Sequence, residues 1–311
     1  AHLKQRFTIL SPFNSPNAPV VRAAINAGFW AILDMGDPQD KGIEYSLKQL
    51  QTLTSNGSFG VRLPRSLTQQ RWRPHHLTEW VKRGLIDQVI IDEGEDWGSW
   101  ASLRAVASQK LEVWVEVRSL EGALRVDEDE RISGMVVVAE EAAGFCGEYS
   151  AYIWLQKLAQ MQVKKPYWLR GGMTLSGMIA ALCFGAERVV LDEHLVGCVE
   201  LELPDELQAV FSRVGRSHSL KVQLNDQGNK SHLKRDRFTS IRALNWPKSH
   251  FWQLMKQTDM NEAISHAAWG SHHGHRIIPL SASWPQINRS YRTLVKRWDR
   301  APRCADILCY I

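Results

Sequence analysis

Short apolar runs in this chain end repeatedly in charged or polar residues, and those residue types suit acid–base chemistry, anion binding or ion pairing. If the runs are parallel strands, their carboxyl ends meet at one edge, where such folds place their reacting groups. We expect part of this charged rim to pair across the mouth. The positions are Ser11, Pro12, Phe13 and Asn14, then Asp34, Arg62, Asp92 with Glu93, Glu116 with Arg118, Glu140 with Glu141, Arg170 to Gly172, and Asp192 to His194.

The turn Arg170-Gly171-Gly172 is the strongest local signal in the chain. Two glycines let the backbone approach a ligand closely, and the N–H groups at the start of the following helix attract anions. A tight strand-to-helix connection also favours glycine, so a purely structural interpretation competes with this one. The position after a seventh apolar run, where parallel barrels commonly hold phosphate, favours an anion site.

Eight apolar, β-branched runs alternate with amphipathic stretches, as in a parallel sheet covered on both faces. Open doubly wound sheets alternate in the same way, but the count of eight favours a closed (β/α)8 barrel, the TIM barrel. The expected strands are residues 7–10, 30–33, 59–63, 88–92, 112–117, 134–138, 167–170 and 188–191. The expected helices are residues 19–27, 40–53, 76–83, 99–108, 120–124, 150–161, 175–184 and 204–213.

The chain divides into an expected barrel at residues 5–214 and a basic, Trp-rich extension at residues 215–311. The formal net charge is +5, and the surplus of Lys, Arg and His lies mostly between residues 213 and 303, so an anionic partner would bind the extension. Within it we expect a small hairpin with residues 226–228 in the turn. The histidines His266, His272, His273 and His275 are interpreted as an exposed cluster, and we expect no metal site.

The composition favours a protein of the reducing cytoplasm. Five cysteines show neither metal-ligand nor disulfide spacing. No window approaches the ~18 uninterrupted apolar residues of a membrane span.

Several stretches resemble the nitronate monooxygenase and enoyl-reductase barrels that bind FMN. RGGMTLSGMIAALCFGAERVVLDEHL resembles their phosphate-binding segment, SPFNSPNAPVVRAAINAGFWAILDMG their first βαβ segment, and FGVRL their third strand. The stretch EEAAGFCGEYSAYIWLQKL is similar to one in the N-terminal barrel domains of bacterial modular polyketide and polyunsaturated-fatty-acid-type synthases. The resemblance covers residues 6 to 214 and implies a TIM barrel that acts in such a synthase.

The resemblance also implies roles for single residues. Gly171 and Gly172, preceded by Arg170, match the backbone cradle of the FMN phosphate. Gly185 matches the glycine before the last strand, and Ser11, Pro12, Phe13 and Asn14 match the loop under the flavin ring. Asp192 stands at the end of the phosphate site. Any acid, base or nucleophile would come from Glu116, Glu141, Cys146 or His194.

Three departures from the family pattern oppose the cofactor. Phe145 stands where the monooxygenases carry the histidine that serves as general base. Asp192 and Glu193 replace a small Gly-Thr pair and would repel a phosphate dianion unless they turn away or face Arg170. Phe29 and Trp30 replace glycines, and their bulk is expected to fill space near the flavin.

Two functions therefore stay open. The first is a barrel with a degenerate flavin site that serves as a docking or structural module without FMN. The second is an FMN-dependent oxidoreductase, of enoyl-reductase or monooxygenase type, acting on acyl thioesters. An acyl carrier protein or neighbouring synthase domains are the expected partners, a homodimer is open, and nucleic acid or a membrane is not expected.

Overall fold

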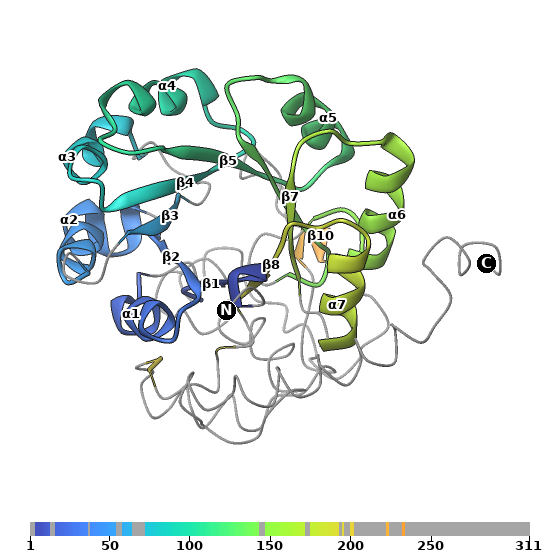
Figure 1. The fold of residues 1–311 in the computed structure, drawn as a ribbon, viewed down its shortest axis with the longest axis horizontal. Helices are drawn as coiled ribbons and strands as arrows, with labels where there is room; N and C mark the ends of the chain where they lie inside the picture. The colour runs from blue at the N-terminus through green and yellow to red at the C-terminus, as the bar shows by residue number, and fades with distance from the viewer. Residues whose placement is uncertain are drawn as a thin grey trace.

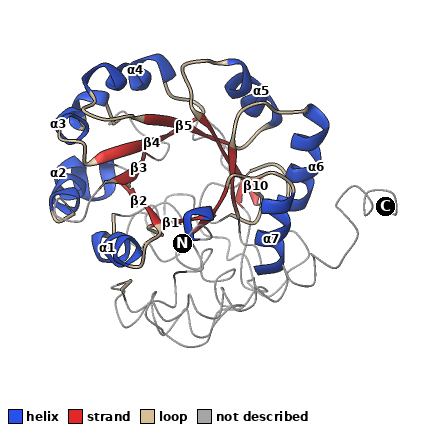
Figure 2. Ribbon diagram, in the orientation of Figure 1, coloured by secondary structure: helices blue, strands red, loops and turns tan. Residues whose placement is uncertain are grey.

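The chain folds into a closed ring of eight parallel strands surrounded by helices, the TIM barrel that the sequence predicts (Figures 1 and 2). This computed structural model describes residues 4–12, 16–36, 38–53, 58–63, 72–142, 147–171, 175–192, 195, 200–201, 222–223 and 232–233. The first strand pairs in parallel with both the second and the eighth. That pairing closes the sheet and excludes the open doubly wound alternative.

The barrel strands follow one another around the ring in chain order. They are β1 (Phe7–Leu10), β2 (Trp30–Asp34), β3 (Phe59–Leu63), β4 (Ile86–Asp92), β5 (Glu112–Val117), β6 (Gly134–Val138), β7 (Tyr167–Arg170) and β8 (Arg188–Leu191). Six of these agree with the expected strands residue for residue, because a run buried on both faces is mostly apolar and stands out from the turns around it. The other two are longer than expected: β2 includes Asp34 at its carboxyl end, and β4 begins two residues earlier, at Ile86.

Helices cover the outside of the ring (Figure 2). They are α1 (Ala18–Asn26), α2 (Pro38–Gln51), α3 (Thr78–Lys82), α4 (Trp97–Ala101), α5 (Leu120–Glu128), α6 (Ala151–Met161) and α7 (Leu175–Cys183), with short 3-10 helices η1 (Lys4–Arg6), η2 (Pro74–His76) and η3 (Ser102–Val106). Side-chain oxygens at Asp96, Ser119 and Ser150 accept hydrogen bonds from backbone N–H groups in the first turns of α4, α5 and α6. These caps fix where the helices begin.

Two helices differ from the expectation by more than two residues at one end. The fourth ends at Ala101 and continues as η3, so the single helix expected at residues 99–108 is wrong. The fifth runs on to Glu128 because Ala123 and Val126 bury one face against the barrel. The eighth expected helix, residues 204–213, lies outside the described residues.

Apolar side chains form two separate cores. The larger one fills the space between strands and helices, with residues such as Val89, Leu169 and Trp154. The smaller one occupies the lumen of the barrel as a middle layer of Leu10, Ile32, Ile90, Trp114, Val136, Trp168 and Val190. Trp114 and Trp168 stack there with ring centroids 4.2 Å apart. The lumen is therefore packed, and its two ends are separate sites.

In the extension, the two-residue strands β9 (Val222–Gln223) and β10 (His232–Leu233) pair antiparallel, which agrees with the expected hairpin. The residues of its turn lie outside the described part. Among the helices that the structure describes, none has the length and apolar character needed to cross a membrane.

Candidate functional site

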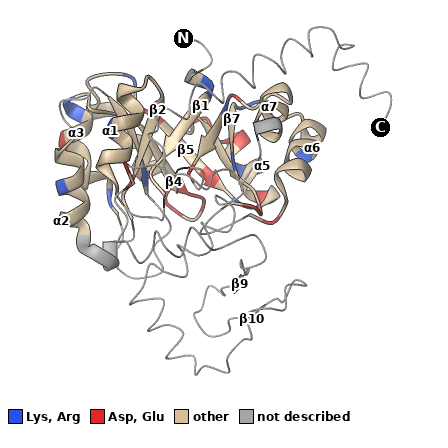
Figure 3. Cartoon of the chain, turned by 90° about the horizontal axis from the view of Figure 1, so that it is seen from below, with Lys and Arg blue, Asp and Glu red and all other residues tan. Residues whose placement is uncertain are grey.

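The carboxyl ends of the barrel strands carry a layer of buried ionic side chains, directly above the middle layer of the lumen. We refer to this layer as the ionic floor and define it as Asp34, Arg62, Asp92, Glu116, Arg118, Arg170 and Asp192. All except Arg118 are at most 2% exposed. Figure 3 marks such acidic and basic positions on the strands as well as on the outer helices. The expectation that rim charges pair across the mouth is confirmed.

Glu116, near the end of β5, is the centre of the ionic floor. Its Oε1 accepts hydrogen bonds from Arg62 Nε at 2.9 Å and from Arg170 Nη1 at 2.7 Å. Its Oε2 accepts from Arg62 Nη2 at 2.8 Å and from Arg118 Nη2 at 2.7 Å. One carboxylate thus holds three guanidinium groups from β3, β7 and the residue after β5.

Each of these arginines also pairs with an aspartate. Arg62 Nη1 donates to Asp34, and Arg118 Nη1 donates to Asp92.

At the other side of the floor, Arg170 Nε donates to Asp192 Oδ2 at 2.7 Å. Asp34 is held further by the backbone: its N–H donates to Ser11 Oγ at 2.7 Å, and its Oδ1 accepts from the Gly36 N–H at 2.8 Å. The floor is therefore a connected network that joins the ends of six strands.

Burial and the neighbouring guanidiniums shift the pKa values of these carboxyl groups in opposite directions. Burial alone would raise the pKa of Glu116, but the guanidiniums of Arg62, Arg170 and Arg118 outweigh it and hold that pKa well below its usual range. For Asp34 burial is the larger influence, and its pKa is raised despite Arg62. Glu116 therefore stays ionised and does not exchange a proton near neutral pH.

The glycine turn after β7 has a packing reason of its own. A Cβ at Gly171 would lie 2.8 Å from the Cβ of Ala139, closer than real Cβ contacts come. The end of β6 therefore requires a glycine at this position, whether or not a ligand is bound. Arg170 points its side chain into the floor rather than toward the turn.

The structure brings some of the predicted site residues together and separates others. Ser11, Glu116, Arg170, Gly171 and Asp192 lie at the carboxyl-end mouth, with Pro12 next to Ser11 in the chain. Phe13, Asn14, Cys146, Gly172 and His194 lie outside the described residues, and their predicted roles stay predictions.

For two predicted site residues the structure shows a structural role. Glu141 Oε2 accepts from the Ala151 N–H at 2.9 Å, so this carboxylate stabilises the start of α6. Gly185 lies between α7 and β8, at the opposite end of the barrel, with φ at +100°. Its backbone conformation explains the glycine without a cofactor.

One expectation about bulk needs correction, and one condition attached to the expected charge repulsion is met. Trp30 is the first residue of β2 and Phe29 precedes it, so both lie at the amino end of the strand and away from the predicted flavin position. Their side chains therefore do not fill that position. Asp192 turns inward and pairs with Arg170, which is one of the arrangements under which this carboxylate would not repel a phosphate. Glu193 lies outside the described residues.

The described residues contain no group of three or more His, Cys, Asp or Glu arranged to hold a metal ion. The cluster His266, His272, His273 and His275 lies outside them. Sequence analysis missed one feature of the described part: a hollow at the amino end of the barrel, lined by Trp30 and Arg188. Large and charged residues at the starts of β2 and β8 were the available signal.

Comparison with solved structures supports the fold. The chain is similar to FabK from Thermotoga maritima, with 17% sequence identity, a TM-score of 0.71 and 96% of each chain covered. A mutant of that FabK matches with 18% identity, a TM-score of 0.66 and 94% of each chain covered. Nitroalkane oxidase from Streptomyces ansochromogenes matches with 17% identity, a TM-score of 0.55, and 91% of this chain and 94% of that chain covered. No family model and no curated protein sequence matches the chain.

Proposed function

We propose that this chain is an FMN-dependent oxidoreductase barrel that acts on acyl thioesters in a polyketide- or fatty-acid-type synthase. The observation that supports it best is the contact between Asp192 and Arg170. Of the three sequence departures that oppose the cofactor, one is the pair Asp192 and Glu193; the contact neutralises Asp192, and Glu193 lies outside the described residues. The position of Phe29 and Trp30 at the other end removes a second. The third, Phe145, lies outside the described residues.

The described residues fit the cofactor as a platform rather than as a complete site. The main chain after β7, at Gly171 and Gly172, would hold the phosphate at the start of α7. The loop from Ser11 to Asn14 would lie beside the flavin ring. FMN supplies the redox step, because its ring accepts or gives up electrons together with a proton or as a hydride.

The ionic floor has a defined task in this proposal. Three guanidiniums and four carboxylates, joined by hydrogen bonds and shielded from water, present a rigid polar surface that closes the lumen from above. Such a preorganised surface keeps its dipoles fixed while charge develops above it. A proton for the substrate would come from His194 or Cys146, since Glu116 and Glu141 are engaged elsewhere.

The hydrogen bonds that occupy Glu116 and Glu141 also favour a second candidate function. Among the described residues at the mouth, both predicted carboxylate acids serve structural contacts, and Gly171 is explained by packing against Ala139. A barrel of this kind that has lost its flavin would act as a docking module, holding an acyl chain or the arm of a carrier protein above the ionic floor.

Flavin binding separates the two functions. The purified chain should absorb at about 450 nm, or gain this absorbance and quench FMN fluorescence on titration with FMN. A Gly172→Glu variant should lose the binding, because the added carboxylate opposes the phosphate. A Ser108→Glu variant, with the same added charge at an exposed position far along the chain, should keep it. A colourless wild-type protein that ignores added FMN would refute the first function and favour the docking module.

A further inference from the structure

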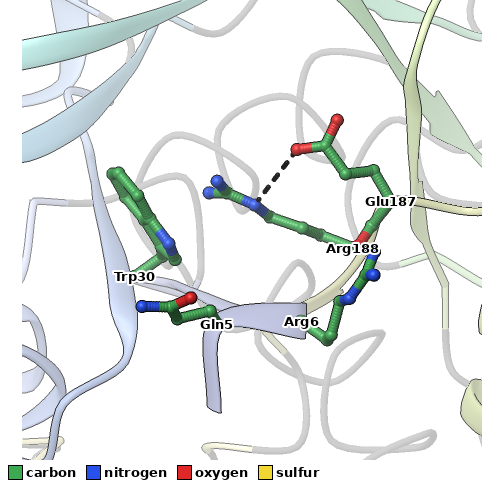
Figure 4. A pocket seen from close by; sticks show the side chains of 5 residues that line it. All are labelled: Gln5, Arg6, Trp30, Glu187 and Arg188. Atoms are coloured by element: carbon green, nitrogen blue, oxygen red, sulfur yellow. Dashed lines mark hydrogen bonds and ion pairs between the residues drawn. The ribbon is translucent and has the colours of Figure 1, made fainter. Parts of the chain in front are cut away.

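The amino end of the barrel opens into a hollow of about 440 Å³. Gln5 and Arg6 line it from the segment before β1, Trp30 from the start of β2, and Glu187 and Arg188 from the start of β8 (Figure 4). The middle layer of the lumen separates this hollow from the ionic floor, so it is a different site from the one proposed for FMN.

Arg188 is the principal residue of this hollow. Its side chain is only 11% exposed, and its guanidinium carbon lies 4.2 Å from the ring centroid of Trp30 and 4.9 Å from that of Trp168. Its Nη1 is buried and has no hydrogen-bond partner among the residues that the structure describes. Its Nε lies 3.5 Å from Glu187 Oε1, which is beyond good hydrogen-bond distance (Figure 4). A buried guanidinium with an unused donor is unusual, because leaving a charged donor unsatisfied is costly.

The residues that line the hollow carry more positive than negative charge, although Glu112 and Asp87, which are not part of the lining, also act on Arg188. Burial lowers the pKa of Arg188, and the nearby guanidinium of Arg6 adds to the effect, while Glu187, Glu112 and Asp87 oppose it. Arg6 itself donates from Nη1 to the backbone carbonyl of Glu187 at 3.1 Å, which keeps its guanidinium at the hollow. Two cations and one carboxylate thus line the space, giving a formal charge of +1.

Within the described part of the chain, further buried polar atoms toward the amino end of the lumen also lack hydrogen-bond partners. They are Thr8 Oγ1, Gln88 Oε1 and Trp168 Nε1. Thr8 pairs in register with Trp30 and Trp168 with Arg188, so these side chains lie on the same inner wall as the hollow. A polar ligand or the water around it would satisfy them.

We propose that this hollow binds a small oxyanion, with Arg188 as the principal donor and Arg6 as the second cation. The chemistry is that of a phosphate or a carboxylate, whose oxygens accept hydrogen bonds from a guanidinium in its own plane. A volume of about 440 Å³ far exceeds the ~30 Å³ that one water occupies and falls in the range of small-ligand sites. A free ion and the anionic group of a larger metabolite are both compatible with it.

The test measures binding of inorganic phosphate and of acetate to the full chain by calorimetry and thermal shift, at matched ionic strength against chloride. The wild type should bind at least one of the two anions. Arg188→Gln should weaken this binding about tenfold or more, because a charge-assisted hydrogen bond is lost. Arg6→Gln should weaken it less. Arg125→Gln is the matched control, since Arg125 also lies over a tryptophan, Trp97 at 4.8 Å, but far from the hollow.

Gly172→Glu distinguishes this site from the proposed FMN site, because it alters only the carboxyl-end mouth. The oxyanion affinity should survive this change even if flavin binding is lost or was never present. If neither anion binds above the chloride baseline, the proposal fails. It fails equally if Gly172→Glu abolishes the binding or if Arg6→Gln and Arg188→Gln bind as tightly as wild type. If Arg188→Gln does not fold, the anion affinity of Arg6→Gln is compared with that of the wild type, because Arg6 is exposed and its replacement should not disturb folding.

Discussion

Replacing Glu116 by glutamine removes the centre of the ionic floor while keeping its shape. The wild-type carboxylate accepts four hydrogen bonds from three arginines, at distances between 2.7 and 2.9 Å. The glutamine oxygen can still accept about half of them, but its NH2 group then faces guanidinium donors. Each arginine keeps one aspartate, Asp34, Asp92 or Asp192, so the loss is local rather than a collapse of the charge balance.

We therefore expect Glu116→Gln to lower the free energy of unfolding by about 3 kcal/mol, the lower end of the cost of breaking a buried pair. That loss is a large part of the free energy of unfolding of a whole protein, which is typically about 5–15 kcal/mol. The assay is urea unfolding followed by circular dichroism and tryptophan fluorescence. The control, Glu121→Gln at an exposed position of α5, should change stability by less than about 0.5 kcal/mol. A loss below about 1 kcal/mol for Glu116→Gln would refute the network as a stabilising unit.

Three further outcomes are expected. Because the pKa of Glu116 is depressed in the folded state, its contribution is present above its ordinary value of 4.5 and is lost as pH falls below it; the stability gap between wild type and Glu116→Gln should shrink there, and a gap independent of pH would contradict the assignment. Gly171→Ala should cost about 1–3 kcal/mol by crowding Ala139, measured by urea unfolding, whereas an unchanged midpoint would mean that the turn relaxes freely. Burial raises the pKa of Tyr167 to about 12, so the tyrosinate absorbance missing from Tyr167→Phe should be the part that develops last in an alkaline titration; loss of the hydrogen bond to the Phe184 carbonyl should also cost about 1 kcal/mol.

The barrel could be predicted from the sequence because its strands are buried on both faces. A run such as GMVVV at Gly134–Val138 is apolar and buried at every position, as expected of a strand inside a layered fold. The pairing of rim charges could also be predicted, since Arg62 and Glu116 both lie near the carboxyl ends of strands that close into one ring.

Which charges pair could not be predicted. The side-chain direction alternates along each strand, so the partner of Arg170 depends on the register between β7 and β8 and on the stagger around the ring. Asp192 could therefore not be assigned to the floor or to the phosphate from its position in the chain alone. Phe29 and Trp30 differ from the expectation for a simpler reason: they precede and begin β2, whereas the residues that face a ligand at the mouth lie where a strand ends.

The packed middle layer of the lumen determines where protons can travel. Leucine, isoleucine and valine side chains neither give nor take a proton, and the indoles of Trp114 and Trp168 can donate a hydrogen bond but have no basic nitrogen to accept one. A relay through the axis of the barrel is thereby interrupted. Any reaction at the carboxyl-end mouth must exchange its protons with solvent on that side. A change in ionisation around Arg188, at the other end, would therefore not alter the pH–rate profile of that reaction.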